Sequence, residues 1–238
     1  MKYLIVNSKN YPEVAGKRIF ELASVIEAVK RRASRKRKEL EFILAVPAFC
    51  VQAICSRFQR LPIFCQHLDA SPLGSSTGFL VPELARSYGA RGSIVNHSEH
   101  QLSFEKLSVT IARLKETDLK SLVCARTSYE VRKFALLRPD FIAVEPPELI
   151  GTGRSVSKAK PQLIVQSVKA LEKVEGNLAS RLPVLLCGAG IVSGQDAKRA
   201  VELGTQGILV SSGVVRSQNW KESIEALADG IINVESKI

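Results

Sequence analysis

The chain has 238 residues, an apolar content of 45% and a formal net charge of +11. This length fits one large domain or two small ones, and the composition is that of an ordinary soluble globular protein. No apolar run approaches the roughly 18 residues that a membrane-spanning helix needs. Residues 1–7 lack the apolar region and cleavage site of a signal peptide. We therefore expect a cytoplasmic protein that does not enter a membrane.

The excess positive charge favours anionic partners, and its densest run is KRRASRKRK at residues 30–38. Such a run can contact nucleic acid or a membrane surface. It also suits a solvated helix end, where cations lie favourably at the negative end of the helix dipole. No aromatic side chain interleaves with these charges to stack on bases, so we favour the helix end and do not expect nucleic acid as a partner.

The five cysteines are an odd number and show no zinc-type clustering. In a reducing compartment this pattern predicts buried, free thiols. We expect no metal site from these residues.

Short apolar runs recur along the chain at a steady spacing, and glycines and prolines separate them. Each run is apolar on consecutive positions, which is typical of parallel strands buried on both faces. The predicted strands cover residues 3–6, 42–46, 63–65, 92–95, 122–124, 141–144, 184–187 and 207–210.

Apolar residues with helical spacing lie between these strands. They are Ile19, Leu22, Ala23, Ile26 and Val29; Phe104, Leu107, Ile111 and Leu114; Ile164, Val168 and Leu171; and Ile224, Leu227, Ala228 and Ile231. Eight strand–helix units predict an α/β protein with one closed (β/α)8 barrel, the TIM barrel, over residues 1–238. An open doubly wound sheet is the alternative, but it usually has fewer units and needs a reversal of strand order.

In such a barrel, the residues directly after the strands face a common site. They are Asn7 and Lys9 after the first strand; Asn96, His97, Ser98 and Glu99 after the fourth; Glu145 after the sixth; Gly188, Ala189 and Gly190 after the seventh; and Ser211, Ser212 and Gly213 after the eighth. One base, one imidazole, one ammonium group and loops of small residues thus converge on one face. The polar residues from Ser98 to Ser103 also look like the start of a helix, and the N–H groups of a helix start would favour a neutral imidazole at His97.

The segment VEPPELIGTG at residues 144–153 is the most informative one. Glu145 ends an apolar strand, and two prolines then stiffen the chain because each fixes its φ angle. The glycines at the far end let backbone N–H groups approach an anion closely. A base beside a closing anion clamp predicts proton transfer on a small phosphorylated substrate.

These motifs together resemble the triosephosphate isomerase family, and in particular its compact archaeal type. The resemblance covers essentially the whole chain. The motifs that carry it are NSK at residues 7–9, NHSE at 96–99, VEPPELIGTG at 144–153, SKAKP at 157–161 and CGAGI at 187–191.

The resemblance implies interconversion of dihydroxyacetone phosphate and D-glyceraldehyde 3-phosphate, a step of glycolysis and gluconeogenesis, without a metal or an organic cofactor. By the same resemblance, Glu145 is the base, His97 polarises the carbonyl group and Lys9 is the electrostatic partner. Glu99 orients its neighbours. Substrate-binding residues are implied to be Asn7, Lys9, Ile150, Gly151, Gly153, Gly188, Ser211 and Ser212.

The family is at least dimeric, so the resemblance also implies a homodimer or homotetramer. Residues 74–79 form the loop that reaches a neighbouring subunit in the family, and here this loop lacks the expected histidines. Arg154 and residues 176–181 also depart from the pattern.

Two other functions compete with the isomerase. A phosphate-binding barrel lyase or synthase would share the phosphate loops but would carry different groups after strands one, four and six. A nucleic-acid binder built on residues 30–38 would explain the charge but not the loops.

Overall fold

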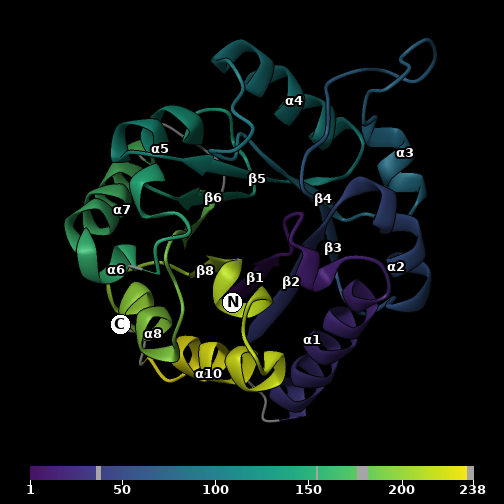
Figure 1. Ribbon diagram of the computed structural model, residues 1–238. Coiled ribbons are helices and arrows are strands. Elements are labelled where there is room, and N and C mark those ends of the chain that lie inside the picture. The colour runs from purple at the N-terminus through teal and green to yellow at the C-terminus, as the bar shows by residue number, and fades with distance from the viewer. Residues whose placement is uncertain (36–38, 154, 176–181, 235–238) are drawn as a thin grey trace.

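The computed structural model describes residues 1–35, 39–153, 155–175 and 182–234. Three stretches that the sequence singles out lie outside these described residues. They are 36–38 of the basic run, Arg154, and 176–181. Eight parallel strands pair in chain order and close into a barrel, with helices around it (Figure 1). The strands are β1 (Lys2–Asn7), β2 (Leu40–Val46), β3 (Ile63–Cys65), β4 (Gly92–Val95), β5 (Lys120–Ala125), β6 (Phe141–Val144), β7 (Val184–Cys187) and β8 (Gly207–Val210).

The predicted barrel is thereby confirmed, and the open sheet is excluded because β8 pairs with β1. Five predicted strands match the observed bounds residue for residue. β1, β2 and β5 each extend further by one or two residues at one end or both, because the chain continues to pair with a neighbouring strand there, as Lys2 does with Leu40.

The helices between the strands bury the predicted apolar faces. Those of α1, α4, α7 and α10 are buried, with Phe104 and Val168 only partly so. The helices are α1 (Arg18–Arg35), α2 (Val51–Arg57), α3 (Pro82–Ser87), α4 (Phe104–Glu116), α5 (Ser128–Ala135), α6 (Val156–Ala159), α7 (Pro161–Glu175), α8 (Gly194–Glu202), α9 (Ser212–Val215) and α10 (Trp220–Ile232), with 3-10 turns η1 (Pro12–Val14), η2 (Ala48–Cys50) and η3 (Pro147–Leu149). In the described part of the chain, no helix is long and apolar enough to cross a membrane.

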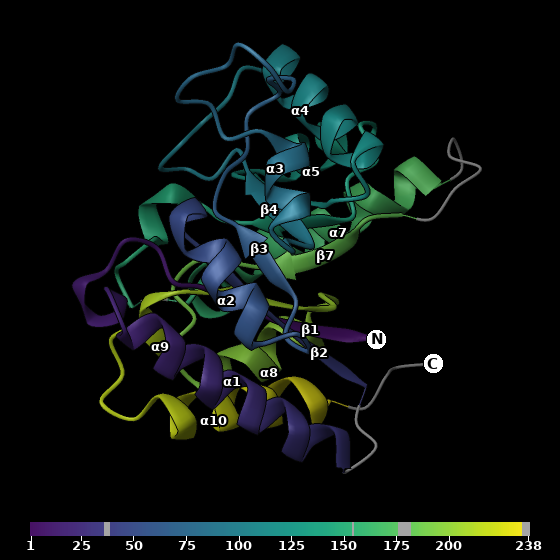
Figure 2. The ribbon, with the colours of Figure 1, turned by 90° about the vertical axis from the view of Figure 1, so that its right-hand side faces the viewer.

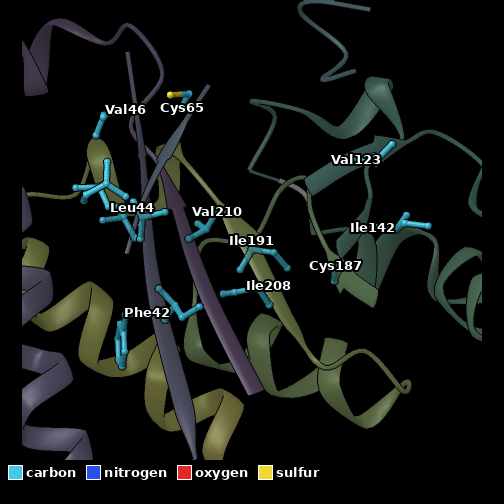
Figure 3. Packing of buried hydrophobic residues seen from close by; sticks show 14 of the residues in the cluster. Phe42, Leu44, Val46, Cys65, Val123, Ile142, Cys187, Ile191, Ile208 and Val210 are labelled. Atoms are coloured by element: carbon cyan, nitrogen blue, oxygen red, sulfur yellow. The ribbon is translucent and has the colours of Figure 1, made fainter. Parts of the chain in front are cut away.

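The core has two layers because strand side chains alternate between the two faces of the sheet. Ile5, Ile43 and Phe64 belong to a cluster built almost entirely from strand residues, which fills the barrel interior. Phe42, Leu44 and their equivalents on other strands join the helices in a larger outer cluster. Figure 3 shows part of this outer layer from close by.

The basic run begins on the last turns of α1. Lys30 pairs with Glu41, and Arg32 pairs with Glu225 on α10 at 2.9 Å. These cations thus take part in local ion pairs at a helix end, in keeping with the interpretation that we favour above.

All strands point the same way, so their carboxyl ends gather on one side. Figure 2 places the amino-terminal end of β1 on the right and the loop that follows β1 on the left. The loops that follow the other strands reach the same side as that loop, and they carry the predicted site residues.

Candidate active site

One cavity opens at the carboxyl ends of the strands, and it gathers most of the predicted site residues. From the predicted set, its described lining includes Asn7, Lys9, His97, Glu145, Ile150, Gly151, Ser211 and Ser212. Glu99 lines a neighbouring groove that shares Asn7, Lys9 and His97 with the cavity. Gly153 and Gly188 are absent from the described lining of both.

The turn after β1 presents the Lys9 ammonium group to the cavity. Lys9 has a φ angle of 47°, a left-handed conformation that costs roughly 1–2 kcal/mol for a residue with a Cβ. Two hydrogen bonds offset this strain: Lys9 N–H donates to Asn7 Oδ1 at 3.0 Å, and Gln66 Nε2 donates to Lys9 O at 3.0 Å. Lys9 Nζ contacts Glu99 Oε1 at 2.6 Å, which ties the loops after β1 and β4 together.

His97 follows β4 and is almost fully buried. The backbone N–H of Glu99 donates to His97 Nδ1 at 3.2 Å. A ring nitrogen that accepts a hydrogen bond carries no proton, so this contact favours the neutral imidazole with its proton on Nε2. His97 Nε2 then faces the Glu145 carboxylate, with 3.7 Å between Nε2 and Oε2.

The expected helix beginning at Ser98 is wrong. α4 begins only at Phe104, after Ser103, whose side chain accepts a hydrogen bond from the Lys106 N–H as an N-cap. In the intervening turn, the N–H groups are used by neighbouring loop atoms, because Leu102 N–H donates to Asn96 Oδ1 and His100 N–H donates to His97 O. A single turn N–H, rather than a helix end, therefore contacts the imidazole.

Glu145 follows β6, and its side chain is 6% exposed. Its backbone N–H donates to Ala125 O of β5 at 2.8 Å, which fixes the base of the side chain. Oε2 is buried and has no hydrogen-bond partner among the described residues. A buried carboxylate oxygen without a hydrogen bond is costly, and this one lies 3.7 Å from His97 Nε2.

Cys124, on the neighbouring strand β5, lies against the Glu145 carboxylate. Burial, followed by the negative charge of Glu145 and a hydrogen bond to it, raises the pKa of the Cys124 thiol well above its usual value. The thiol is therefore protonated and can donate to the carboxylate. The sequence predicted only buried, free thiols for the cysteines and gave no reason to place Cys124 beside the carboxylate.

Gly188 makes room for Glu145. A Cβ at this position would lie 2.3 Å from Glu145 Cγ and 2.5 Å from Glu145 Oε1. Such distances are shorter than any normal contact, so a larger residue would displace the carboxylate. The structure thus places Gly188 against the predicted base, whereas the resemblance implied that it binds substrate.

The loops after β7 and β8 form the end of the cavity that suits an anion. Gly151 and Gly190 have φ angles of 74° and 70°, and both line the cavity with Ser211 and Ser212. The Ser211 hydroxyl is buried without a hydrogen-bond partner in the described part of the chain. Small residues leave backbone N–H groups accessible to phosphate oxygens.

The segment between Glu145 and α6 covers the cavity with Ile150 and Gly151. Its far end is fastened to α8, where Ser157 Oγ donates to Asp196 O at 3.2 Å, and to the loop after β7, where Val156 N–H donates to Ala189 O at 3.4 Å. Although burial opposes ionisation, hydrogen bonds from Lys158 and Ser193 hold the pKa of Asp196 below its usual value.

The sequence did not predict four of the residues that line the cavity: Tyr11, Ile191, Leu209 and Val210. Leu209 and Val210 end β8 directly before Ser211, so their place in the chain could have indicated them. Tyr11 offers no comparable signal. Its ring lies under the Arg216 guanidinium, at 4.5 Å, a contact between distant parts of the chain.

Known proteins resemble this chain along nearly its full length. The sequence pattern of the family described as "Triosephosphate isomerase" matches residues 2–227. The triosephosphate isomerase of Cenarchaeum symbiosum is 41% identical over 228 residues, which cover 96% of this chain and 97% of that protein. The triosephosphate isomerase of Archaeoglobus fulgidus is 39% identical over 227 residues, covering 95% and 97%.

A solved structure supports the fold independently. The triosephosphate isomerase of Bartonella henselae superimposes with a TM-score of 0.70 at 18% identity, over 96% of this chain and 98% of that one. The family match and the two archaeal relatives show that the chain belongs to the triosephosphate isomerase family.

Proposed function

We propose that Glu145, His97 and Lys9 perform the proton transfers by which this enzyme interconverts dihydroxyacetone phosphate and D-glyceraldehyde 3-phosphate. The observation that carries the proposal is the buried pair at the barrel mouth: Glu145 Oε2 and His97 Nε2 lie 3.7 Å apart, with Lys9 in the same cavity. Each group comes from a different strand end, so only the closed barrel brings them together.

The chemistry needs a base and a stabiliser for the charge that develops on oxygen. The Glu145 carboxylate removes a proton from the carbon beside the carbonyl group, which leaves an enediolate, and the protonated Glu145 then returns the proton to the neighbouring carbon. His97 Nε2–H donates to a substrate oxygen, and the Lys9 ammonium group stabilises the negative charge. A glutamate base paired with a neutral histidine, with water excluded by a closing loop, is the established description of this family's reaction.

The phosphate group binds at the opposite end of the cavity. The assignment is supported by the small residues Gly151, Ser211 and Ser212, which line the cavity, and by the Ser211 hydroxyl, which has no hydrogen-bond partner among the described residues. Binding there holds the carbon chain between Glu145 and His97. The described residues contain no group of three or more side chains that could hold a metal ion, and the proposed steps use side chains of the protein alone.

The test is the Glu145→Gln variant, assayed with glyceraldehyde 3-phosphate in a coupled assay. Loss of the base should lower kcat by about 10²–10⁴-fold, while the Kd for inorganic phosphate stays close to that of the wild type. The matched control is Glu116→Gln, a 62% exposed glutamate on α4 that should keep full activity. A kcat for Glu145→Gln equal to that of the wild type would remove the base assignment.

We also propose self-association as a homodimer or homotetramer. The segment between β3 and α3 extends away from the barrel (Figure 1). It carries the exposed side chains of Leu73 and Phe79, which are 57% and 55% exposed, and Phe49 of the preceding loop is 89% exposed. Exposed apolar side chains in one region are typical of a protein–protein interface.

We further propose that the enzyme works in the cytoplasm. All five cysteines are free, including Cys50 and Cys55, which are only partly buried. Free thiols of this kind persist in a reducing compartment.

A further inference from the structure

Asn96 occupies the turn between the end of β4 and His97. Its φ angle is 58°, in the left-handed region that glycine and asparagine adopt most readily. This turn redirects the chain from the strand into the loop, so it sets the direction in which the next residue leaves the barrel wall. The backbone of Asn96 therefore determines the position and direction in which the His97 side chain leaves the backbone.

The Asn96 side chain fastens this turn at two points. Nδ2 donates to Cys124 O of β5 at 3.0 Å, and Oδ1 accepts a hydrogen bond from Leu102 N–H at 2.9 Å. A carbonyl oxygen needs a donor and an N–H needs an acceptor, so the two partners fix the orientation of the amide. An aspartate could satisfy the Leu102 contact, but it has no donor for Cys124 O.

The residue held by Asn96 is the one that lies against the predicted base. The Cys124 thiol contacts the Glu145 carboxylate, and the next residue, Ala125, accepts the Glu145 backbone N–H at 2.8 Å. A continuous set of contacts therefore runs from His97 through Asn96 and Cys124 to Glu145. It joins the two groups whose separation the reaction depends on.

We propose that Asn96 is a positioning residue that sets the separation of His97 and Glu145 by fastening the end of β4 to Cys124. The proposal rests on the proposed function, because it assigns the spacing of the catalytic pair named there. Asn96 is not among the described residues that line the cavity, so in this proposal it acts through its neighbours. A displacement of about 1 Å between reacting groups can cost about 10²-fold in rate.

The test compares Asn96→Gly with Asn96→Asp. Glycine keeps the left-handed turn but removes both side-chain hydrogen bonds. Aspartate keeps the turn and the hydrogen bond from Leu102 N–H, but it places a carboxylate oxygen, which cannot donate, against Cys124 O. Both variants should lose about 10²-fold in kcat with little change in KM, because the phosphate contacts lie on other loops. The matched control is Asp118→Gly, which changes another left-handed residue, with a φ angle of 54°, to glycine, far from the site.

A spectroscopic measurement separates positioning from general stability. The chain has three histidines, so the imidazole ¹⁵N signals of His97 can be assigned by substitution of His67 and His100. We expect the Nδ1 and Nε2 signals of His97 to shift in Asn96→Gly and Asn96→Asp, and to stay unchanged in Asp118→Gly.

The outcomes distinguish this proposal from the function it rests on. If the wild-type enzyme is active and Glu145→Gln is inactive, the proposed function holds whatever the activity of the Asn96 variants. A kcat within about 2-fold of wild type in a folded Asn96 variant would then overturn the positioning role alone. A fall in kcat without any change in the His97 signals would also overturn it. Should Asn96→Gly fail to fold, Asn96→Asp decides, because wild-type activity in that variant would show the Cys124 contact to be dispensable.

Discussion

At the scale of single residues, the space for the Glu145 carboxylate depends on a neighbouring position that carries no Cβ. Gly188 has no side chain, and the carboxylate occupies the volume that a Cβ would fill. The φ angle of Gly188 is outside the left-handed region, so its backbone does not require glycine. The absence of a Cβ therefore serves the carboxylate rather than the turn.

Gly188→Ala should displace the Glu145 carboxylate without straining the backbone. A Cβ at 2.5 Å from Oε1 forces the side chain away from its present position. We expect kcat to fall by about 10²-fold, the usual cost of a displacement near 1 Å, with the Kd for inorganic phosphate little changed. Steady-state kinetics and a phosphate titration measure the two effects. An unchanged kcat would show that the carboxylate works from a position away from Gly188.

At the scale of elements, the segment from Glu145 to α6 is held at both ends and carries two glycines between them. The prolines at 146 and 147 fix the start, and Ser157 holds the end through Asp196 O at 3.2 Å. Between these points, Gly151 and Gly153 adopt left-handed conformations, and an added Cβ at either would meet no atom within 4 Å. This arrangement suits a lid that moves as a unit between two fixed ends.

Deleting residues 150–152 should open the cavity to water. Closure of the site normally prevents the enediolate from losing phosphate. Without closure, the enediolate would lose phosphate before it is reprotonated. We expect slower isomerisation together with release of methylglyoxal and inorganic phosphate, both measurable during turnover. The full-length enzyme, assayed in parallel, serves as the control. Slow isomerisation free of these products would contradict the lid role.

The elements were more predictable than the contacts between them. Strands such as β6 and β7 are runs of consecutive apolar residues, and burial on both faces of a parallel sheet requires that pattern. Strand order then places Glu145, His97 and Lys9 at one end, so the composition of the cavity follows from the topology.

The predictions failed where one tertiary contact decides the local structure. The turn after His97 was expected to be helical because its polar residues resemble a helix start, but the Asn96 side chain accepts the Leu102 N–H and holds the chain in a turn. The relation of Gly188 to Glu145 depends on packing between β6 and β7, which no local pattern encodes.

At the scale of the whole molecule, barrel closure leaves no sheet edge open, so further association has to use loops and helices. The groove beside the cavity is lined by Phe49 and Leu80 together with Lys9 and His97. A partner seated in this groove would thus contact the loops that hold catalytic groups. Assembly and activity are expected to be coupled for this reason.

Phe49→Ser should therefore weaken self-association and activity together. Phe49 is 89% exposed in the single chain, and burying a phenylalanine side chain contributes about 1.5–3 kcal/mol, which corresponds to roughly 10–100-fold in a dissociation constant. Sedimentation velocity over a range of protein concentrations measures the assembly, and kcat at the same concentrations measures the coupling. Tyr129→Ser is the matched control, because Tyr129 is an aromatic residue on α5 that is 72% exposed and lies outside the groove. A wild-type chain that stays monomeric at every concentration would contradict the proposed assembly, whereas a variant that dissociates yet keeps full kcat would contradict only the coupling.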